Sequence, residues 1–441
     1  MRLPTFLLLA ASGLVLSCRE GSGDRTMTLI DPGHFHASLI QKNMLEGVSG
    51  TVKVFAPEGE ELQTYLAAIE SFNSRAENPT CWKEEVHAGA DYLEALPEAE
   101  KGDFVVLAGD NGKKADYLLA AVRKGYHVLS DKPLAIDGKG FSTLKEAYSL
   151  AEEKGLVIYD LMTERYDVLN LVSRELTGDK ELFGAPVAVA MSSVHHFYKN
   201  VSGAVLKRPA WYYDVRRQGE GIADVTTHLV DQVFWQCFPG EAIDIQDVTL
   251  KEADHDPTAV TPEQYTASTG VAAFPDDLRD DVADGALQVL SNGSFSFEVK
   301  GVPVSIRVRW DYEAPAGSGD TSESLFKGTG ATVRLVQDAS TGFVRQLFLS
   351  APEEAAGKAE KRLRKKYPYI DFKPSGEDSF LVDIPSGDRP GHEAHFNLVA
   401  KTFLAYLDGK DLPAWERTNT LTKYYLTTGA AELARKKNRG K

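Results

Sequence analysis

Two short segments of the chain hold residue types that suit proton and hydride chemistry. The first is Asp131-Lys132-Pro133, and the second is the glycine-rich segment 219–231, which contains Asp224 and His228. Residues four apart share one face of a helix, so we predict that Asp224 and His228 lie side by side. A neighbouring carboxylate raises the basicity of an imidazole and fixes its tautomer, which prepares His228 to take a hydroxyl proton. Lys132 would hydrogen-bond the reacting oxygen and stabilise its developing charge. We therefore predict a catalytic set of Lys132, Asp224 and His228, with a structural ion pair on one helix face as the alternative.

The histidines are grouped along the chain. Six of the ten form three close pairs, namely His34/His36, His195/His196 and His392/His395. In one interpretation they line a polyol pocket, in which Trp211 and Tyr212 stack on a pyranose face. In the other, some of them bind a divalent metal with Glu393 or Asp224, as in a metal-dependent hydrolase or lyase. The spacing His392-x-x-His395 is not that of a zinc-protease pair, so we assign no metal site. The predicted substrate-binding residues are Arg165, His195, His196, Lys199, Trp211, Tyr212, His228, His392 and His395.

Alternating apolar runs and amphipathic segments must position these residues in the first part of the chain. Strands alternating with helices of this length predict a doubly wound parallel sheet, a Rossmann domain over residues 27–162. Ligands of such sheets bind at the carboxyl ends of the strands, where Lys132 is placed. The predicted strands are 27–30, 51–55, 104–108, 127–129 and 156–159, and the predicted helices are 37–45, 60–75, 115–124 and 141–154.

The pattern changes after residue 163, where period-two alternation predicts a large, mainly antiparallel sheet in an α+β domain, residues 163–441. We expect this domain to bind the substrate and to form the dimer contact. Asn292-Gly293 and the segment 340–342 are predicted turns, and 253–285 is a predicted irregular insertion. The predicted strands are 186–194, 294–299, 304–312, 332–336 and 343–349, and the predicted helices are 353–366, 396–407 and 419–436.

The turn after the first strand resembles a dinucleotide loop only in part. A full fingerprint reads G-x-G-x-x-G, because the backbone must approach the pyrophosphate, whereas this chain keeps only Gly33. Glu58, after the second strand, could hold a ribose hydroxyl pair or be a solvated turn residue. No arginine lies nearby, which favours NAD over NADP. The predicted cofactor-binding residues are Gly33, His34, Phe35, His36, Glu58, Gly109, Asp110, Asp131 and Lys132.

The N-terminus has the form of a targeting segment. An apolar run from Leu3 to Leu16 is too short for a permanent membrane span and ends in Ser17-Cys18, which resembles a lipobox. We therefore predict a signal peptide over residues 1–18, a tether over 19–26 and an exported, lipid-anchored protein, with an ordinary signal peptide as the alternative. The formal charge of −15 argues against a nucleic-acid partner.

With these motifs in place, the chain resembles the Gfo/Idh/MocA family of sugar oxidoreductases. The resemblance rests on Asp131-Lys132-Pro133, on 219–231 and on Glu164-Arg165-Tyr166, and it covers residues 27–231. It implies a Rossmann domain followed by an α/β domain whose open sheet often makes a homo-oligomer contact, and it implies catalytic roles for Lys132, Asp224 and His228. The chain departs from the family in its degraded glycine loop, in Asp131 where Glu is usual, and in its enlarged C-terminal domain.

The expected function is oxidation of a sugar or glycoside hydroxyl by NAD or NADP outside the cytoplasm. Free nicotinamide nucleotide is scarce there, so the cofactor would be retained and recycled on the enzyme. Ping-pong sugar oxidation and reduction would achieve this, and so would transient oxidation followed by elimination, which is net glycosidase or lyase chemistry. The alternatives are a lipid-anchored carbohydrate-binding protein without redox activity and the metal-dependent sugar hydrolase or lyase.

Overall fold

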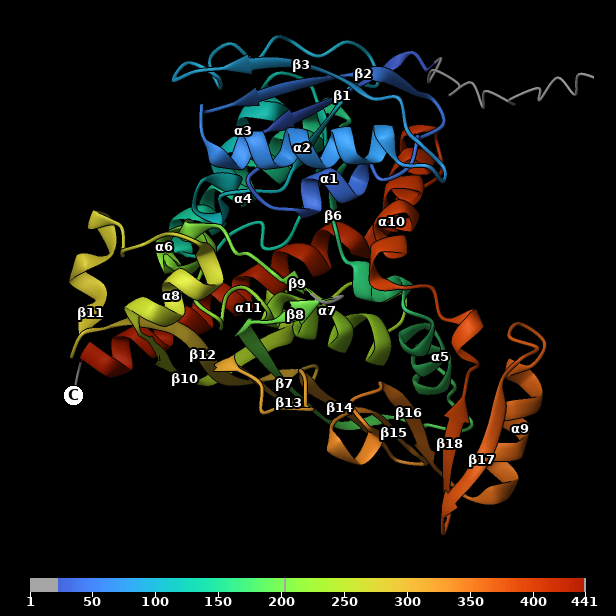
Figure 1. Ribbon diagram of the computed structural model, residues 1–441. Helices are drawn as coiled ribbons and strands as arrows, with labels where there is room; N and C mark the ends of the chain where they lie inside the picture. The colour runs from blue at the N-terminus through green and yellow to red at the C-terminus, as the bar shows by residue number, and fades with distance from the viewer. Residues whose placement is uncertain (1–22, 202–203, 440–441) are drawn as a thin grey trace, which may run out of the picture.

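A six-stranded, wholly parallel sheet forms the N-terminal part of the computed structural model (Figure 1). The structure describes residues 23–201 and 204–439, so the predicted signal peptide with Cys18 lies outside the described residues. The strand order is β3-β2-β1-β4-β5-β6, which reverses direction between β1 and β4. This confirms the predicted doubly wound fold. The strands are β1 (Arg25–Ile30), β2 (Val48–Ala56), β3 (Lys83–Ala88), β4 (Phe104–Leu107), β5 (His127–Ser130) and β6 (Ile158–Asp160).

Helices cover both faces of this sheet, as the fold requires. They are α1 (His36–Ile40), α2 (Glu60–Ser74), α3 (Asn111–Arg123) and α4 (Gly138–Lys154). The predicted helix 37–45 was too long, since α1 ends at Ile40 and the chain turns at Gln41. Strand β3 could not be predicted from the sequence, because its residues are mostly exposed at the sheet edge and form no apolar run.

A ten-stranded mixed sheet forms the second layer, and only its β13–β7 pair is parallel among the strands that the structure describes. This confirms the large, mainly antiparallel sheet. The order is β10-β12-β13-β7-β14-β15-β16-β18-β17, with β11 beside β12. The strands are β7 (Pro186–Tyr198), β10 (Val248–Val260), β11 (Val282–Ala283), β12 (Ala286–Val299), β13 (Val302–Glu313), β14 (Thr321–Gly328), β15 (Thr332–Gln337), β16 (Gln346–Ser350), β17 (Asp371–Gly376) and β18 (Ser379–Asp383).

Two local predictions for this sheet were wrong. Asn292-Gly293 lies inside β12, where Gly293 makes room for a neighbour: a Cβ atom there would lie 2.7 Å from Cβ of Ile222. The segment 253–285 is largely regular, since it holds the second half of β10 and the helix α8 (Pro262–Thr269). The charged helix predicted at 353–366 is present as α9 (Glu353–Leu363).

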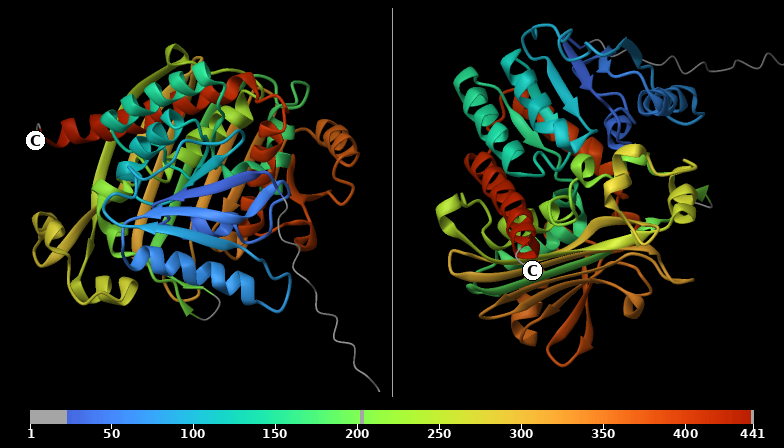
Figure 2. Two further views of the ribbon diagram at one scale, coloured as in Figure 1. Left: turned by 90° about the horizontal axis from the view of Figure 1, so that it is seen from above. Right: turned by 90° about the vertical axis from the view of Figure 1, so that its left-hand side faces the viewer.

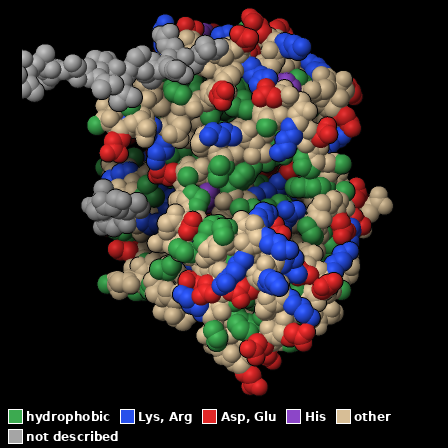
Figure 3. Space-filling model, turned by 90° about the vertical axis from the view of Figure 1, so that its right-hand side faces the viewer, with side chains coloured by type: hydrophobic (Ala, Val, Ile, Leu, Met, Phe, Trp, Pro, Cys, Tyr) green, Lys and Arg blue, Asp and Glu red, His purple; other side chains and the backbone are tan. Residues whose placement is uncertain are grey.

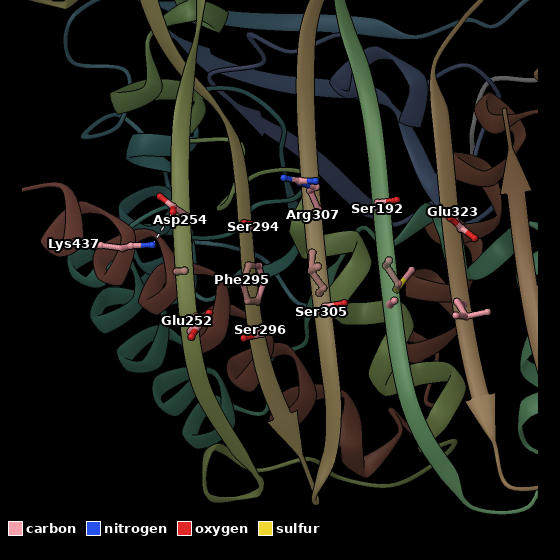
Figure 4. A pocket seen from close by; sticks show the side chains of 15 residues that line it. Ser192, Glu252, Asp254, Ser294, Phe295, Ser296, Ser305, Arg307, Glu323 and Lys437 are labelled. Carbon is pink, nitrogen blue, oxygen red and sulfur yellow. Dashed lines mark hydrogen bonds and ion pairs between the residues drawn. The ribbon is translucent and has the colours of Figure 1, made fainter. Parts of the chain in front are cut away.

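The large sheet has one covered and one open face. Helices α5 (Val168–Thr177) and α7 (Thr226–Cys237) pack their apolar sides on the inner face. On the outer face of β13 every second residue is exposed, including Arg307 and Arg309. The right-hand view of Figure 2 shows no helix along most of this outer face. A shallow hollow on the sheet is lined by side chains of β7, β10, β12, β13 and β14 (Figure 4).

The last two helices join the two layers. Helix α10 (His392–Leu407) buries Phe396 and Phe403 against the first sheet, on the side of α1 and α2. Helix α11 (Ala414–Arg439) places Tyr424 in the core formed with α3 and α4, and Leu426 in the core of the large sheet. Helices distant in sequence therefore fix the orientation of the two sheets. Within the described ranges, no helix has the length and apolar character that crossing a membrane requires.

Candidate active site

The candidate site lies at the carboxyl ends of β1, β4 and β5, where the strand order reverses and α/β sheets bind their ligands. The loops after β1 and β4 approach closely there. A Cβ atom on Gly109 would lie 2.0 Å from the carbonyl oxygen of Asp31, so only glycine fits. The amide of His34 also donates to the carbonyl of Ala108 across 3.0 Å. These contacts fix the position of the loop that carries His34 and His36.

Lys132 stands directly after β5 and reaches across to the C-terminal domain. Its Nζ donates to Oδ1 of Asp224 over 2.6 Å, and both side chains are largely buried. Burial disfavours the ammonium, but the carboxylates of Asp224 and Asp131 outweigh it and raise the pKa of Lys132. Lys132 is therefore a cation at neutral pH. The buried Lys114 of α3 supports it by donating to the backbone carbonyl of Asp131 over 3.0 Å.

Asp224 does not pair with His228, contrary to the prediction. Helix α7 begins at Thr226, so Asp224 lies in the turn before it and the four-residue helical spacing does not apply. The carboxylate instead accepts from Lys132 through Oδ1 and from Gln218, across 2.8 Å, through Oδ2. Asp224 therefore holds the lysine rather than the imidazole.

His228 lies in the first turn of α7 with a buried Nδ1 that has no hydrogen-bond partner among the described residues. Burial first, and then the charge of Lys132, lower its pKa to about 4, although Glu164 raises it. The prediction that His228 is more basic than a free imidazole was therefore wrong. His228 is neutral at pH 7, and it lies close enough to Lys132 to be affected by that charge.

Asp131, His34 and His36 form a compact group beside this pair. Oδ2 of Asp131 lies 2.9 Å from Nδ1 of His36 and 3.3 Å from Nδ1 of His34. Burial lowers the pKa of His36 to about 3, against the opposing charge of Asp131, so its imidazole is neutral at pH 7. Burial opposes the Asp131 carboxylate, but His36 and its neighbours outweigh it and hold the pKa of Asp131 well below its usual range.

The residues around Gly33 fit a dinucleotide. Trp211, from the C-terminal domain, has a buried Nε1 with no partner among the described residues, and this atom lies 3.7 Å from the Cβ position that Gly33 leaves free. Such an unused donor beside a glycine loop is suited to an oxygen-rich ligand. Gly33, His34 and the exposed Phe35 line this region, and Glu58 occupies the exposed turn after β2.

Asp110 has a different task from the predicted one. Its Oδ1 caps α3 by accepting from the amide of Gly112 over 3.0 Å, and its Oδ2 pairs with Nε of Arg217 at 2.9 Å. Both oxygens are thus used within the protein. The Arg217 guanidinium in turn lies over the Trp211 ring, 5.4 Å from its centroid.

The predicted substrate residues at the end of β7 gather around one carboxylate, Asp320. His196 contacts it through Nδ1 at 2.9 Å, His195 through Nδ1 at 3.5 Å, and Lys199 through Nζ. Tyr212 connects this group with the catalytic one: burial raises the pKa of its phenol, and the charges of Lys132 and Asp320 both act on it.

The prediction that Arg165 binds substrate was wrong. Its guanidinium is buried and makes paired hydrogen bonds with Asp231, at 2.6 and 2.7 Å, and with Glu416, at 2.8 Å. All of this lies beneath the site, between α7 and α11. Arg165 therefore stabilises the junction between the sheets.

The neighbouring Glu164 belongs to the site, although the sequence analysis did not select it. Burial raises the pKa of its carboxyl, but Arg345, His228 and His392 outweigh burial and lower it to about 2. Arg345, directly before β16, contacts it at 2.9 Å. The Glu-Arg-Tyr motif was visible in the sequence, but only the fold shows which of its charged residues faces the site.

The third histidine pair lies in the first turn of α10, which begins at His392, four residues before the start of the predicted helix 396–407. His392 is exposed and its ring centroid lies 6.4 Å from that of His36, whereas His395 is buried, with neither ring nitrogen bonded among the described residues. Figure 3 shows a hollow between the two domains on the face that carries α10, with a histidine side chain in it.

Two family models match the chain. Residues 173–435 match the model described as "Putative oxidoreductase C terminal domain", and residues 43–160 match the Gfo/Idh/MocA model, described as an oxidoreductase family with an NAD-binding Rossmann fold. A comparison with curated proteins gives no match.

Solved structures give the same result. A protein from Parabacteroides merdae, described as a "putative oxidoreductase", is 39% identical, with a TM-score of 0.91 over 95% of this chain and 98% of that chain. A levoglucosan dehydrogenase in complex with NADH and levoglucosan has a TM-score of 0.58 at 13% identity, covering 93% and 97%. A 3-ketoreductase from Actinomadura kijaniata, in complex with TDP-benzene and NADP, has a TM-score of 0.54 at 14% identity, covering 92% and 96%. The last two share the fold. The chain belongs to the Gfo/Idh/MocA family and is a nicotinamide-dependent oxidoreductase with a NAD-binding Rossmann domain.

Proposed function

We propose that the enzyme oxidises a secondary hydroxyl of a sugar or glycoside, using Lys132 and His228 on the same hydroxyl group. One observation carries this proposal: the charged Lys132, at the strand ends of the cofactor domain, lies near enough to the neutral His228 of α7 for its charge to lower the pKa of that imidazole. The named relatives support the substrate class, since levoglucosan and L-sorbose, bound in the dehydrogenase complexes, are carbohydrates.

Lys132 and His228 have different roles, because the first is charged and the second is neutral at pH 7. The neutral His228 accepts the hydroxyl proton, a step worth about 10²–10⁴-fold in rate for a positioned base. The Lys132 ammonium donates a hydrogen bond to the same oxygen and stabilises the alkoxide character that develops on it. The C–H bond of that carbon breaks as the C=O bond forms, and the nicotinamide ring supplies the acceptor for the hydride. Asp224 holds Lys132 in place.

Tyr212, Trp211 and the group around Asp320 would bind the remainder of the sugar. The charges of Lys132 and Asp320 both act on the phenol of Tyr212, so a sugar ring bound near the lysine and this tyrosine could also reach His195 and Lys199, which contact Asp320. Aromatic faces and charged polar groups together are the usual means of holding a polyol.

We also propose that the protein is exported, lipid-anchored at Cys18 and keeps its cofactor between turnovers. Export would deprive it of free nucleotide, so reduction of a second sugar, or elimination followed by re-reduction, would regenerate NAD or NADP in place. The open face of the large sheet, with Arg307 of β13 and Glu323 of β14 around its hollow (Figure 4), is our candidate for contact with a second copy.

The test has two parts. One sample of the purified protein is denatured and assayed for released nucleotide. In a second, native sample, nicotinamide absorbance at 340 nm is followed with levoglucosan, D-glucose and a glycoside. We expect bound or added nucleotide to be reduced by at least one of these sugars and the Lys132→Met variant to be inactive. Lys101→Met, which changes an exposed lysine in a turn, serves as the matched control. Sugar binding without reduction of any nucleotide would contradict the proposal.

A further inference from the structure

The group formed by Asp131, His34 and His36 has a geometry that hydride transfer does not require. Each of its three side chains offers an atom that could bind a metal, and these three atoms all lie within 4.8 Å of one another. The two histidines come from the loop after β1 and the aspartate from the end of β5. Lys132 and His228, not this group, face the reacting hydroxyl in the proposed function.

The distances match those of ligands around a single ion. Ligand atoms at about 2.0–2.2 Å from a cation are separated by about 3.0 Å in octahedral and about 3.4 Å in tetrahedral geometry. The measured separations from Oδ2 of Asp131 are 2.9 Å to His36 and 3.3 Å to His34.

Two buried atoms of the group are poorly satisfied. Oδ1 of Asp131 has no hydrogen bond among the described residues, and Nδ1 of His34 has only the 3.3 Å contact with Oδ2 of Asp131, whose side chain is 4% exposed. Buried polar atoms are rarely left unpaired, so each of these points to a bound group that satisfies it. A cation between the rings and the carboxylate would satisfy Nδ1 of His34 directly.

The surrounding charges act in both directions. The ammonium groups of Lys132 and Lys114 oppose a cation here and the buried carboxylate of Asp131 favours one; pairing with Asp224 at 2.6 Å reduces the effect of Lys132. The group is also held in place, because Gly109 lets the two loops approach and Lys114 fixes the Asp131 backbone. A preformed site loses less entropy on binding a metal.

We propose that His34, His36 and Asp131 bind a divalent first-row transition cation such as Zn²⁺. Two imidazoles and one carboxylate form the donor set that such ions prefer, and three protein ligands leave positions open for a further ligand. The carboxylates considered from the sequence are not involved: Glu393 is exposed and pairs with Lys42, and Asp224 pairs with Lys132.

The test uses the full chain, stripped with a chelator and titrated with Zn²⁺ by calorimetry and with Co²⁺ by visible absorption. We expect one equivalent per chain, and binding that is weaker by about 10–100-fold or more in His36→Gln and in Asp131→Asn. His87→Gln is the control. His87 lies in the edge strand β3, and its ion-pair partner among the described residues is Asp91, which is not part of the group.

A second measurement keeps the proposal testable if either variant fails to fold. Crystals of the unaltered protein soaked in Zn²⁺ should give an anomalous peak between His34, His36 and Asp131. Absence of binding, equal affinity in folded variants, or a peak elsewhere would overturn the proposal. Nucleotide release and sugar oxidation are measured separately, so failure of the metal site and failure of the redox function give different results.

Discussion

Nζ of Lys132 and Oδ1 of Asp224 lie 2.6 Å apart, although 92 residues separate them in sequence and they belong to different domains. The contact joins the end of β5 to the turn before α7. It therefore couples the position of the lysine to the packing of the two domains.

Replacing Asp224 with Asn should weaken both stability and activity. The change leaves a buried ammonium without its counter-charge, which typically costs about 3–5 kcal/mol when one partner of a buried pair is removed. Urea unfolding measures the stability, and kcat/KM measures the activity. Asp116→Asn, on the exposed side of α3, should change neither quantity. A variant as stable and active as the parent would show that the pair has no role.

The proposed general base, His228, should remain unprotonated and active down to about pH 4. Because the pKa of His228 is lowered to about 4, its imidazole stays neutral above that value, and the acid limb of kcat/KM in the free enzyme should lie near pH 4 rather than near 6.5. Glu164 raises this pKa, so Glu164→Gln should move the limb to still lower pH. A limb near pH 6.5 that is unaffected by Glu164→Gln would exclude His228 as the base.

Folding stability should fall on mild acidification. The pKa of His36 is about 3 and that of His228 about 4 in the folded protein, below the 6.5 of the unfolded chain. The unfolded state therefore binds more protons as the pH falls from about 6.5 to 4, and stability is lost across that window. The carboxyl of Glu164, with a pKa near 2 against 4.5 in the unfolded chain, adds a further loss between about pH 4.5 and 2, which overlaps the low end of that window. Denaturation midpoints between pH 7 and 4 check the trend, and His36→Asn should flatten it. A midpoint constant over this range would contradict the assignment.

Gly109→Ala should impair cofactor binding. The new Cβ would meet the Asp31 carbonyl at 2.0 Å, so the loop after β1 must shift, and misplacement of this kind costs about 10²-fold. Titration with NAD measures the effect. Gly357→Ala, in α9 with nothing near its Cβ position, should bind NAD normally and gain roughly 0.5–1 kcal/mol of stability. Unchanged NAD affinity in Gly109→Ala would place the cofactor elsewhere.

Arg165→Met should destabilise the protein without changing sugar specificity. The substitution removes the buried partner of Glu416 and one of the two cations that contact Asp231, which keeps Lys423, at a cost of about 3–5 kcal/mol. The ratio of kcat/KM values between two sugars should stay constant. A large change in that ratio, with stability preserved, would restore the substrate-binding role.

Local patterns in the sequence were sufficient for the elements but not for the pairings between them. Apolar runs identified β4 and β5, because both strands are buried on two sides. Asp224 could not be paired correctly, since the partner is 92 residues away and the helix starts two residues later than the spacing rule requires. The two charged residues Glu164 and Arg165 are adjacent in sequence yet face different surroundings, which only packing against α7 and α11 decides.

The same limit applies to Gly293. The local preference of Asn-Gly predicts a hairpin turn. In the folded chain, the missing side chain of Gly293 instead lets Ile222 pack against β12. The role of Lys114 could not be predicted from the sequence, because its contact with the Asp131 carbonyl group forms only in the tertiary structure.

A double-mutant comparison tests most directly whether Lys132 and His228 act on one hydroxyl. Single-turnover reduction of bound NAD by a responsive sugar should fall by about 10²–10⁴-fold in Lys132→Met and in His228→Asn. Groups that serve the same oxygen act as a unit, so the double variant should be hardly slower than the slower single variant. A double variant whose loss in rate equals the product of the two single losses would contradict this account, and so would a single variant that reduces NAD at the parent rate.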